Sequence, residues 1–280
     1  MKRRVLVVGA TGFTGRRVVA ALVAAGHDVV AFVRPTSDAA AVRALGTPVV
    51  EGDLDRPESL ERALVGRDAV ACAASLGFGH APGIVEAMRR AGVTRSVLLG
   101  TTAVRTTLPA KSKAVRLEAE RVVLADGVGA TLLRPTMIYG APGDRNLERL
   151  VRFVRRWPVV PVLGRGTALV QPVHVEDVAA AVAAVLARDG LAGRAFDVPG
   201  PAPLTFEALV RTVAAVLCRR RVFPHVPAFV GRLVASREQV ARLAEDKDAD
   251  PRPAAEAFGW APRAFEVGIR EEARLLGCLP

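Results

Sequence analysis

Aromatic residues are scarce in this 280-residue chain, at 5% of the total, and only one of them is a tyrosine. Aromatic platforms on which nucleic-acid bases stack are therefore not expected, and no zinc-finger spacing or RNA-binding signature is present. The net charge of +11 is compatible with nucleic acid, anionic lipid or a phosphorylated substrate. We interpret this charge as a solvated, arginine-rich surface and expect no nucleic-acid partner.

Cysteine, histidine and long apolar runs are also scarce. Cys72, Cys218 and Cys278 are odd in number and lack metal-binding or Cys-x-x-Cys spacing. Such cysteines are typical of a reducing compartment, so we expect a cytoplasmic protein. The four histidines have no ligand spacing, and no metal site is predicted. Since no stretch of about 18 uncharged apolar residues exists, no membrane span is expected.

Short apolar runs alternate with helical patterns through the first half of the chain. Apolar, β-branched runs predict strands at 4–10, 28–33, 48–54, 68–75, 95–102 and 129–140. Helical periodicity predicts helices at 16–26, 38–45, 57–66, 83–92 and 109–125. This alternation is typical of the α/β class, with a doubly wound parallel sheet and right-handed crossovers.

The turn after the first strand reads "GATGFTG" and has glycines at 9, 12 and 15. Gly9 permits a tight turn, Gly12 allows the backbone to approach a pyrophosphate, and Gly15 allows close packing of helix on strand. The helix that follows directs free N–H groups at the phosphates. Because the loop joins a strand to a helix, it predicts a dinucleotide site. The other loop residues expected to contact the cofactor are Thr11, Phe13 and Thr14.

The end of the second strand predicts which cofactor is bound. An acidic residue there binds a ribose 2′-hydroxyl, whereas an arginine accommodates a 2′-phosphate. This strand ends "AFVRP", with Arg34 in place of the acid. We therefore expect NADP(H) rather than NAD(H), with NAD(H) as the alternative. Asp53, in "EGDL", is expected over the adenine edge, or as a turn residue or helix cap.

An ordered set of motifs carries a family resemblance. "VLVVGATGFTGRRVV", "GDL", "CAAS", "TLLRPTMIYG", "QPVHVEDVAAAV" and "FDVPGPAPLTFEALV" occur in this order. Together they resemble the extended or atypical short-chain dehydrogenase/reductase superfamily, in its NAD(P)-dependent epimerase/dehydratase group. The resemblance implies a Rossmann domain, a small and mostly helical C-terminal substrate domain, and a site between them. It also implies cofactor contacts from Leu54, Ala73, Ala74 and Pro135.

The pattern loosens after Gly140, where proline and glycine become frequent. Residues 157–166 are expected to be irregular or an edge segment, followed by a helix at 174–187, a strand at 195–200 and a helix at 204–220. We assign 1–140 to the dinucleotide-binding domain, with 168–200 returning to it. We assign 141–167 and 201–280, where short helices are expected near the end, to the C-terminal substrate-binding region.

The catalytic residues of the resembled superfamily do not transfer cleanly. Members use a Ser/Thr after the fifth strand and a Tyr-x-x-x-Lys pair on the next helix. Thr101 fits the first role and is expected to orient a substrate oxygen, with Thr102 beside it. One register places Ser112 and Arg116 at the tyrosine and lysine positions. The other places Pro109 and Lys113 there, so both registers lack the tyrosine.

Several side chains are candidates to replace the missing proton donor. A serine is too weak an acid to donate a proton unaided, and an arginine stabilises an oxyanion without shuttling a proton. Lys113 serves both roles if burial lowers its pKa. Tyr139, the only tyrosine, is either a donor from its loop or a packing residue at a strand end. Glu118 and Glu120 are expected to be surface partners of nearby arginines.

Two further groups are candidates for the substrate side. Asp177 is expected to cap or orient the helix that follows His174. Arg145, Arg149, Arg152 and Arg156 share one helical face, and with Arg155 they either grip an anionic substrate or form an exposed face.

The sequence thus predicts an NAD(P)-dependent oxidoreductase or epimerase/dehydratase. The expected substrate is a carbonyl or hydroxyl small molecule, with a nucleotide-sugar or another anionic or phosphorylated compound as the option. The alternative is a non-catalytic NADP(H)-binding or redox-sensing protein. Homodimerisation through sheet-flanking helices is an expectation from the resemblance.

Overall fold

A seven-stranded parallel sheet forms the centre of the computed structural model, which describes residues 2–109, 111–125, 129–140, 142–144, 146–227 and 245–279. The strand order is β11-β6-β5-β4-β1-β2-β3, and every neighbouring pair is parallel. The strands are β1 (Arg4–Val8), β2 (Asp28–Val33), β3 (Val49–Glu51), β4 (Ala69–Cys72), β5 (Ser96–Leu99), β6 (Ala130–Pro135) and β11 (Ala195–Val198).

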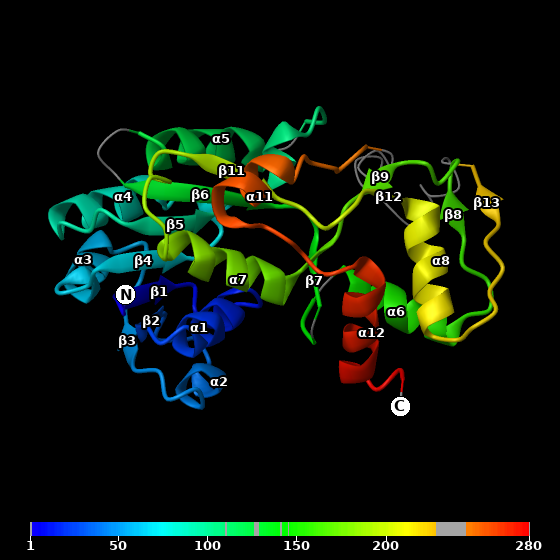
Figure 1. Cartoon of the computed structure of the whole chain (residues 1–280), viewed down its shortest axis with the longest axis horizontal. Coiled ribbons are helices and arrows are strands. Elements are labelled where there is room, and N and C mark those ends of the chain that lie inside the picture. Colours follow the sequence, from blue (N-terminus) through cyan, green and yellow to red (C-terminus); the bar gives the residue numbers. More distant parts are fainter. Residues whose placement is uncertain are drawn as a thin grey trace.

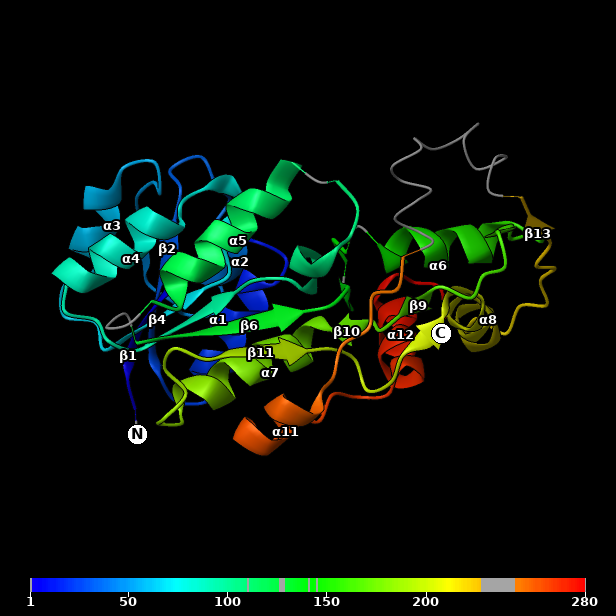
Figure 2. The same ribbon diagram turned by 90° about the horizontal axis from the view of Figure 1, so that it is seen from above.

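Helices cover both faces of this sheet (Figure 2). One face carries α3 (Pro57–Leu64), α4 (Ala81–Arg90) and α5 (Lys111–Val123), and the other carries α1 (Gly15–Ala24), α7 (Val175–Leu186) and α11 (Arg252–Phe258); α2 (Ala40–Arg43) links β2 to β3. Within β1, Val5 and Val7 belong to one buried core, whereas Leu6 and Val8 belong to the other. Burial on both faces explains the continuous apolar runs and confirms the predicted doubly wound sheet.

The C-terminal region lies at the carboxyl edge of the sheet (Figures 1 and 2). Three two-stranded pairs, β10 with β7, β12 with β9 and β13 with β8, lie in this region, and a third apolar core is formed mainly by α6, α8 and α12. The elements are β7 (Ile138–Tyr139), α6 (Leu147–Arg156), β8 (Val162–Leu163), β9 (Leu169–Val170), β10 (Val173–His174), β12 (Leu204–Thr205), α8 (Phe206–Val216), β13 (His225–Val226) and α12 (Phe265–Leu275). As expected, residues 157–166 are mostly irregular and contain the two-residue strand β8 and one isolated bridge residue, Val159.

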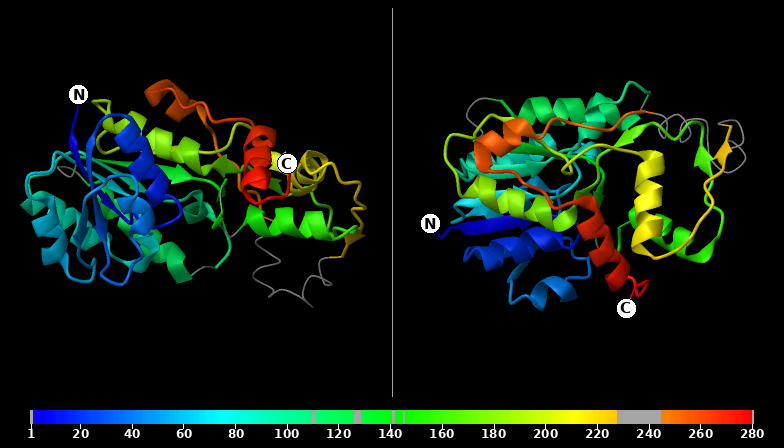
Figure 3. Two further views of the ribbon diagram at one scale, coloured as in Figure 1. Left: turned by 90° about the horizontal axis from the view of Figure 1, so that it is seen from below. Right: turned by 45° about the vertical axis from the view of Figure 1, so that its right-hand side comes forward.

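Chain segments from beyond residue 170 return to the sheet. Helix α7 packs on α1, and β11 pairs with β6. Helix α11 also returns, since Phe258 packs edge-on against Phe196 and the indole N–H of Trp260 donates to the Pro199 carbonyl at 3.1 Å. This segment falls within 201–280, the range that the sequence assigned to the substrate-binding region. The connection from α11 to α12 then crosses between the two parts, and α12 lies between α7 and α8 (Figure 3).

Candidate functional site

The glycine loop between β1 and α1 is tightly folded against the chain around it. Gly9 has a φ of +76°, and a Cβ there would lie 2.7 Å from the Ala74 nitrogen. A Cβ on Gly15 would lie 1.9 Å from the Gly9 carbonyl oxygen. No side chain caps the start of α1, and its first turn contains no acidic residue. The loop therefore offers free N–H groups and a positive helix end to an anion, so these residues fit a dinucleotide pyrophosphate.

A first cavity, the outer cavity, has a volume of about 320 Å³ and opens at the carboxyl ends of β1, β2 and β4. The guanidinium of Arg34 lines it, is exposed, and has no hydrogen-bond or ion-pair partner within the described part of the chain. The sequence did not single out Phe78 and His80, which also line this cavity. The expected cofactor residues that line it are Gly9, Thr11, Gly12, Arg34, Asp53, Leu54, Ala73 and Ala74.

Asp53 has a local structural role as well as a place in the outer cavity. Its carboxylate accepts the Asp55 backbone N–H at 3.1 Å, and its own N–H donates to the Ser59 hydroxyl at 3.0 Å. This is the turn role that the sequence offered as one alternative.

A second cavity, the inner cavity, has a volume of about 240 Å³ and continues the first, because Ala73, Ala74 and Ser75 line both. The expected residues that line it are Thr14, Ala73, Ala74, Thr101, Arg116 and Pro135. The cleft therefore runs from the end of β2, past the glycine loop, to the ends of β5 and β6.

Thr101 begins the short helix η2 (Thr102–Arg105) and faces the inner cavity. Its hydroxyl oxygen accepts the Ala103 backbone N–H at 3.2 Å, which leaves the hydroxyl proton free to be donated. Thr102 does not line the cavity, and its hydroxyl lies 3.5 Å from the Pro135 carbonyl as a donor. The structure thus separates the two neighbouring threonines.

Helix α5 directs Arg116 and Glu120 at the inner cavity. The Arg116 guanidinium lies against Gly77, where a Cβ would be 3.1 Å from its Nε. Lys113 instead donates from Nζ to the Thr106 carbonyl at 2.5 Å and holds the connection before the helix. Neither Lys113 nor Ser112 lines the outer or the inner cavity. Of the candidates on this helix, only Arg116 reaches the cleft.

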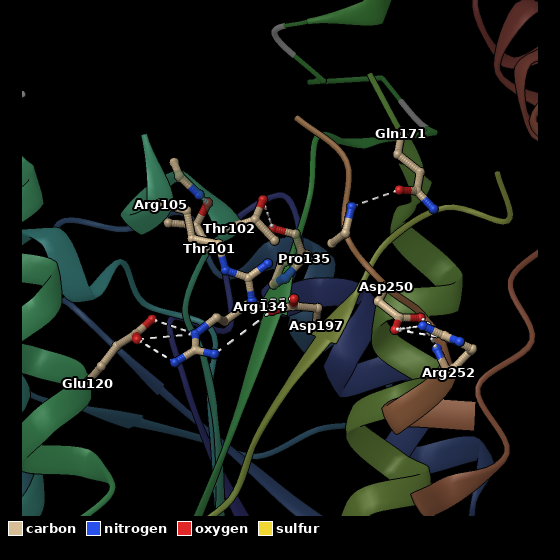
Figure 4. A network of polar contacts seen from close by, with 12 residues as sticks. Thr101, Thr102, Arg105, Glu120, Arg134, Pro135, Gln171, Asp197, Asp250 and Arg252 are labelled. Carbon is tan, nitrogen blue, oxygen red and sulfur yellow. Dashed lines mark hydrogen bonds and ion pairs between the residues drawn. The ribbon is translucent and has the colours of Figure 1, made fainter. Parts of the chain in front are cut away.

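Glu120 is buried, with 7% of its surface exposed, so the expectation of a surface role is wrong for this residue. It accepts hydrogen bonds from Arg134 on β6, the shortest at 2.6 Å (Figure 4). Arg134 also lies 3.9 Å from Asp197 on β11, and Asp197 pairs with Arg105. These contacts hold Glu120 as an ion-pair partner at the base of the cavity. Glu118, by contrast, forms the expected exposed pair with Arg121.

A third cavity, the distal cavity, has a volume of about 530 Å³ and lies beside the C-terminal region. It shares Thr14 and Ile138 with the inner cavity. Phe13 and Met137 give it apolar walls. Arg16 also lines it and donates from its guanidinium to the Pro142 carbonyl at 2.8 Å. Gly15 lines none of these cavities and serves the packing of α1 on the loop.

Tyr139 is a packing residue, as one of the two expectations held. It is 1% exposed, its hydroxyl lies 3.4 Å from the Phe265 carbonyl as a donor, and its ring packs edge-on against His174 and Phe265. Burial raises the pKa of its phenol far above the usual value. It lines none of the described cavities, so its hydroxyl is not placed to act in the cleft.

Helix α7 is capped by a different residue from the one expected. The imidazole Nδ1 of His174 accepts the Glu176 N–H at 3.4 Å, since His174 has extended backbone just before the first turn. Asp177 lies inside that turn and accepts from the Arg263 guanidinium at 2.9 Å. Asp177 therefore does not cap the helix, and it binds Arg263 in the segment that leads into α12. The alternative, that Asp177 orients the helix, stays a prediction.

Two buried carboxyl groups, those of Asp144 and Glu272, lie close together near α6 and α12, and no sequence pattern predicted them. Asp144 accepts backbone N–H groups at the start of α6, including that of Leu147 at 2.8 Å. Glu272, on α12, is fully buried. Burial, and then the nearby charge of Asp144, raise the pKa of Glu272 to about 8. The Glu272 carboxyl group is therefore mostly protonated at neutral pH.

The arginines of α6 form an exposed helix face, which is one of the two alternatives that the sequence left open for them. Arg149, Arg152, Arg155 and Arg156 are exposed on α6 and line none of the three cavities, and Arg145 lies outside the described residues. Across the described ranges, no helix is long and apolar enough to cross a membrane. No group of three or more His, Cys, Asp or Glu in the same ranges is placed to hold a metal ion.

Comparison with known proteins gives the cleft a family context. Residues 9–189 match the model of a family described as NAD(P)H-binding. The chain is 35% identical over 192 residues to a ceramide reductase of Caulobacter vibrioides, covering 64% of this chain and 60% of that protein. Several of the curated relatives are thus matched over less than two thirds of their own length.

Two further matches extend over most of the chain. A (4-alkanoyl-5-oxo-2,5-dihydrofuran-3-yl)methyl phosphate reductase of Streptomyces griseus is 32% identical, covering 95% of this chain and 88% of that protein. A solved nucleoside-diphosphate-sugar epimerase from Pseudomonas aeruginosa is similar with a TM-score of 0.84 at 18% identity, covering 98% and 97% of the two chains. The last match shows the fold alone. The glycine loop, the sheet order and these matches together show that the chain belongs to the NAD(P)H-binding family, within the extended or atypical short-chain dehydrogenase/reductase superfamily.

Proposed function

We propose that the protein is an NADP(H)-dependent reductase that acts on the carbonyl group of a small amphiphilic molecule. The observation that carries this proposal is the continuous cleft, which begins at Arg34, passes the glycine loop and ends at Thr101 and Arg116. Bound NADPH would supply a hydride from its nicotinamide ring. The remaining roles belong to side chains of this chain.

The inner cavity supports the carbonyl end of the reaction. Thr101 donates its free hydroxyl proton as a hydrogen bond to the substrate oxygen, because its own oxygen already accepts the Ala103 N–H. Arg116 stabilises negative charge that develops on this oxygen, since a guanidinium keeps its charge in a cavity. The substrate carbon gains the hydride and the oxygen gains a proton from water, because no free acid of the described residues lines the cavity.

The outer cavity supports NADP(H) over NAD(H). Arg34 lies at the end of β2, where side chains of this fold contact the adenosine ribose of the cofactor. Its guanidinium has no acidic partner within the described ranges. A 2′-phosphate would supply that partner in a bidentate contact.

The distal cavity supports an amphiphilic substrate. Phe13, Met137 and Ile138 provide apolar surface, and Arg16 provides a cation at the same cavity. Two relatives are named as reductases of a ceramide and of an alkanoyl-bearing methyl phosphate, both of which join an apolar chain to a polar group. A nucleotide-sugar is the alternative substrate class and rests on the structural likeness to an epimerase.

The test is NADPH consumption with a panel of 3-oxoacyl and other long-chain carbonyl compounds, and with nucleotide-sugars in parallel. Thr101→Val is expected to lower kcat about 100-fold and to leave NADPH affinity unchanged, since the threonine acts only on the substrate oxygen. Thr102→Val is the matched control and keeps activity, because Thr102 does not line the cavity. Turnover that is unaffected by Thr101→Val would contradict the assigned role.

A second candidate function is cofactor binding without turnover. The specific observation in its favour is that Tyr139 lies outside the described cavities and that Glu120 is already paired with Arg134. Tight NADPH binding with no consumption on either substrate panel would favour this function over the reductase.

A further inference from the structure

The outer side of α6 and the chain after α8 together form an exposed apolar and basic surface, here called the distal tip. It lies at the lower right of Figure 1. Trp157 is 51% exposed and Val222 is 64% exposed, values that are high for large apolar side chains. The distal tip consists of Arg149, Arg152, Phe153, Arg156, Trp157, Val159, Arg219, Arg220 and Val222.

Backbone hydrogen bonds hold the apolar side chains of the distal tip next to one another. Val222 donates its N–H to the Pro158 carbonyl at 3.0 Å and accepts the Val160 N–H at 2.9 Å. Val159 and Val222 are thereby paired across a parallel bridge. The rings of Phe153 and Trp157 are 6.5 Å apart. The exposed apolar surface is therefore a fixed feature of two adjoining segments.

Among the described residues, the exposed charged side chains of this surface are arginines. Leu147, Val151 and Val154 form the buried stripe of α6, so the arginines of this helix project from its outer side. Arg152 pairs with Glu148 at 3.0 Å, and the Arg156 guanidinium lies 5.3 Å from the centre of the Trp157 ring. No acidic side chain within 146–227 or 245–279 pairs with Arg149, Arg156, Arg219 or Arg220.

We propose that the distal tip docks on the surface of an anionic lipid bilayer. Such a surface presents phosphate groups to unpaired arginines and apolar chains to the side chains between them, and tryptophan favours this boundary. A nucleic-acid backbone would satisfy the arginines but would leave Val159 and Val222 in water. The net charge of +11 adds attraction over a longer range.

Docking at the distal tip would also hold the substrate side of the cleft near the bilayer. Helix α6 begins at Leu147, beside Asn146 and Asp144 of the distal cavity, and its outer side carries the distal tip over a length of about 15 Å. The inference does not depend on catalysis, because the residues of the distal tip line none of the cavities.

The experiment adds vesicles to the 280-residue protein and follows tryptophan emission and co-sedimentation. Trp157 is exposed, whereas the other tryptophan, Trp260, is buried and hydrogen-bonded, so a change in emission reports on the distal tip. With vesicles of phosphatidylglycerol and phosphatidylcholine, emission is expected to move to shorter wavelength and the protein to sediment. Phosphatidylcholine alone should give neither effect, and added salt should weaken both.

Two variants and one matched control separate the tip from the overall charge. Arg149→Glu with Arg156→Glu is expected to weaken binding to the anionic vesicles more than about 30-fold. Phe153→Ser is expected to weaken it about fivefold, since one ring is removed. The control, Arg43→Glu with Arg62→Glu, changes the net charge equally at exposed positions on α2 and α3 and should bind within about threefold of the wild type.

Three results would overturn the proposal. One is equal binding to both vesicle types, and another is an equal loss in the tip variant and in the charge-matched control. The third is binding of random-sequence duplex DNA that depends on Arg149 and Arg156 while anionic vesicles do not bind. Circular dichroism of each variant establishes that it is folded before binding is compared.

Discussion

At the scale of single residues, contacts with neighbouring residues determine which side chains of the cleft are free to bind a ligand. Lys113 and Glu120 have chemistry suited to catalysis, but the first holds the Thr106 carbonyl and the second holds Arg134. Arg34 lines the outer cavity and has no acidic partner among the described residues. Arg116 lines the inner cavity, where the carboxylate of Glu120 is already paired with Arg134. We therefore propose that these two arginines bind anionic groups.

The buried carboxyl group of Glu272 should make the stability of the protein depend on pH. Its pKa is about 8 in the folded protein against an ordinary 4.5, so the folded state holds a proton that the unfolded state releases. The free energy of unfolding should fall as pH rises from about 4.5 to about 8 and then level off. Glu272→Gln stays neutral at every pH, so it should remove most of this slope and stabilise the protein by about 4 kcal/mol near pH 8.5.

The measurement is urea unfolding of both proteins near pH 5.5 and near pH 8.5. Glu266→Gln, at an exposed position on the same helix, is the control and should keep the wild-type slope. An unchanged decline in Glu272→Gln would show that another group carries the pH dependence.

At the scale of elements, close backbone approaches decide how α1 and α12 sit on the sheet and on β10. Gly15 brings α1 against the glycine loop, and Gly268 brings α12 against Tyr139 and His174. The sequence predicted the first of these from the motif that contains Gly15. It did not predict the second, because no local pattern shows that a glycine within a helix faces a tyrosine far away in the chain.

Substitutions at two glycines of the loop should have different effects, one on stability and the other on NADPH binding. Gly15→Ala would place a Cβ 1.9 Å from the Gly9 oxygen and should destabilise the protein by about 3 kcal/mol. Gly12→Ala meets the same oxygen at 3.3 Å, so it should fold with a nearly unchanged Tm and bind NADPH at least about tenfold more weakly. Thermal unfolding and NADPH titration of both variants test this, and wild-type affinity in Gly12→Ala would contradict it.

The contact between α12 and β7 should show coupling in a double-mutant cycle. Gly268→Ala would place a Cβ 2.3 Å from the Tyr139 hydroxyl oxygen and should cost about 2 kcal/mol of stability. Tyr139→Phe removes that oxygen, so the double variant should recover about half of the loss. Additive losses in urea unfolding would show that the hydroxyl does not limit the approach of α12.

At the scale of the whole molecule, the sheet and the cofactor loop were predictable because their signals are local. The alternation of apolar runs and helices led to the parallel sheet, and three spaced glycines led to the loop. The rest depends on distant contacts: Glu120 is buried only because Arg134 on β6 meets it, and α11 returns to the sheet through Phe258 and Trp260. The choice among Ser112, Lys113 and Arg116 needed the helix to be placed against the cavity. Dimerisation stays a prediction.

The most direct test of the account is a titration of the wild type and Arg34→Ala with NADPH and with NADH, followed by nicotinamide fluorescence. The wild type should bind NADPH at least about tenfold more tightly than NADH, because a charged contact to a phosphate contributes about 1.5–3 kcal/mol. Arg34→Ala should lose this preference for NADPH while its affinity for NADH stays unchanged. The control is Arg43→Ala, at an exposed position outside the cavity, and it should keep the preference for NADPH. Equal affinities of the wild type for the two nucleotides would contradict the proposed role of Arg34. If neither nucleotide bound, the proposal that the cleft binds a dinucleotide cofactor would be contradicted.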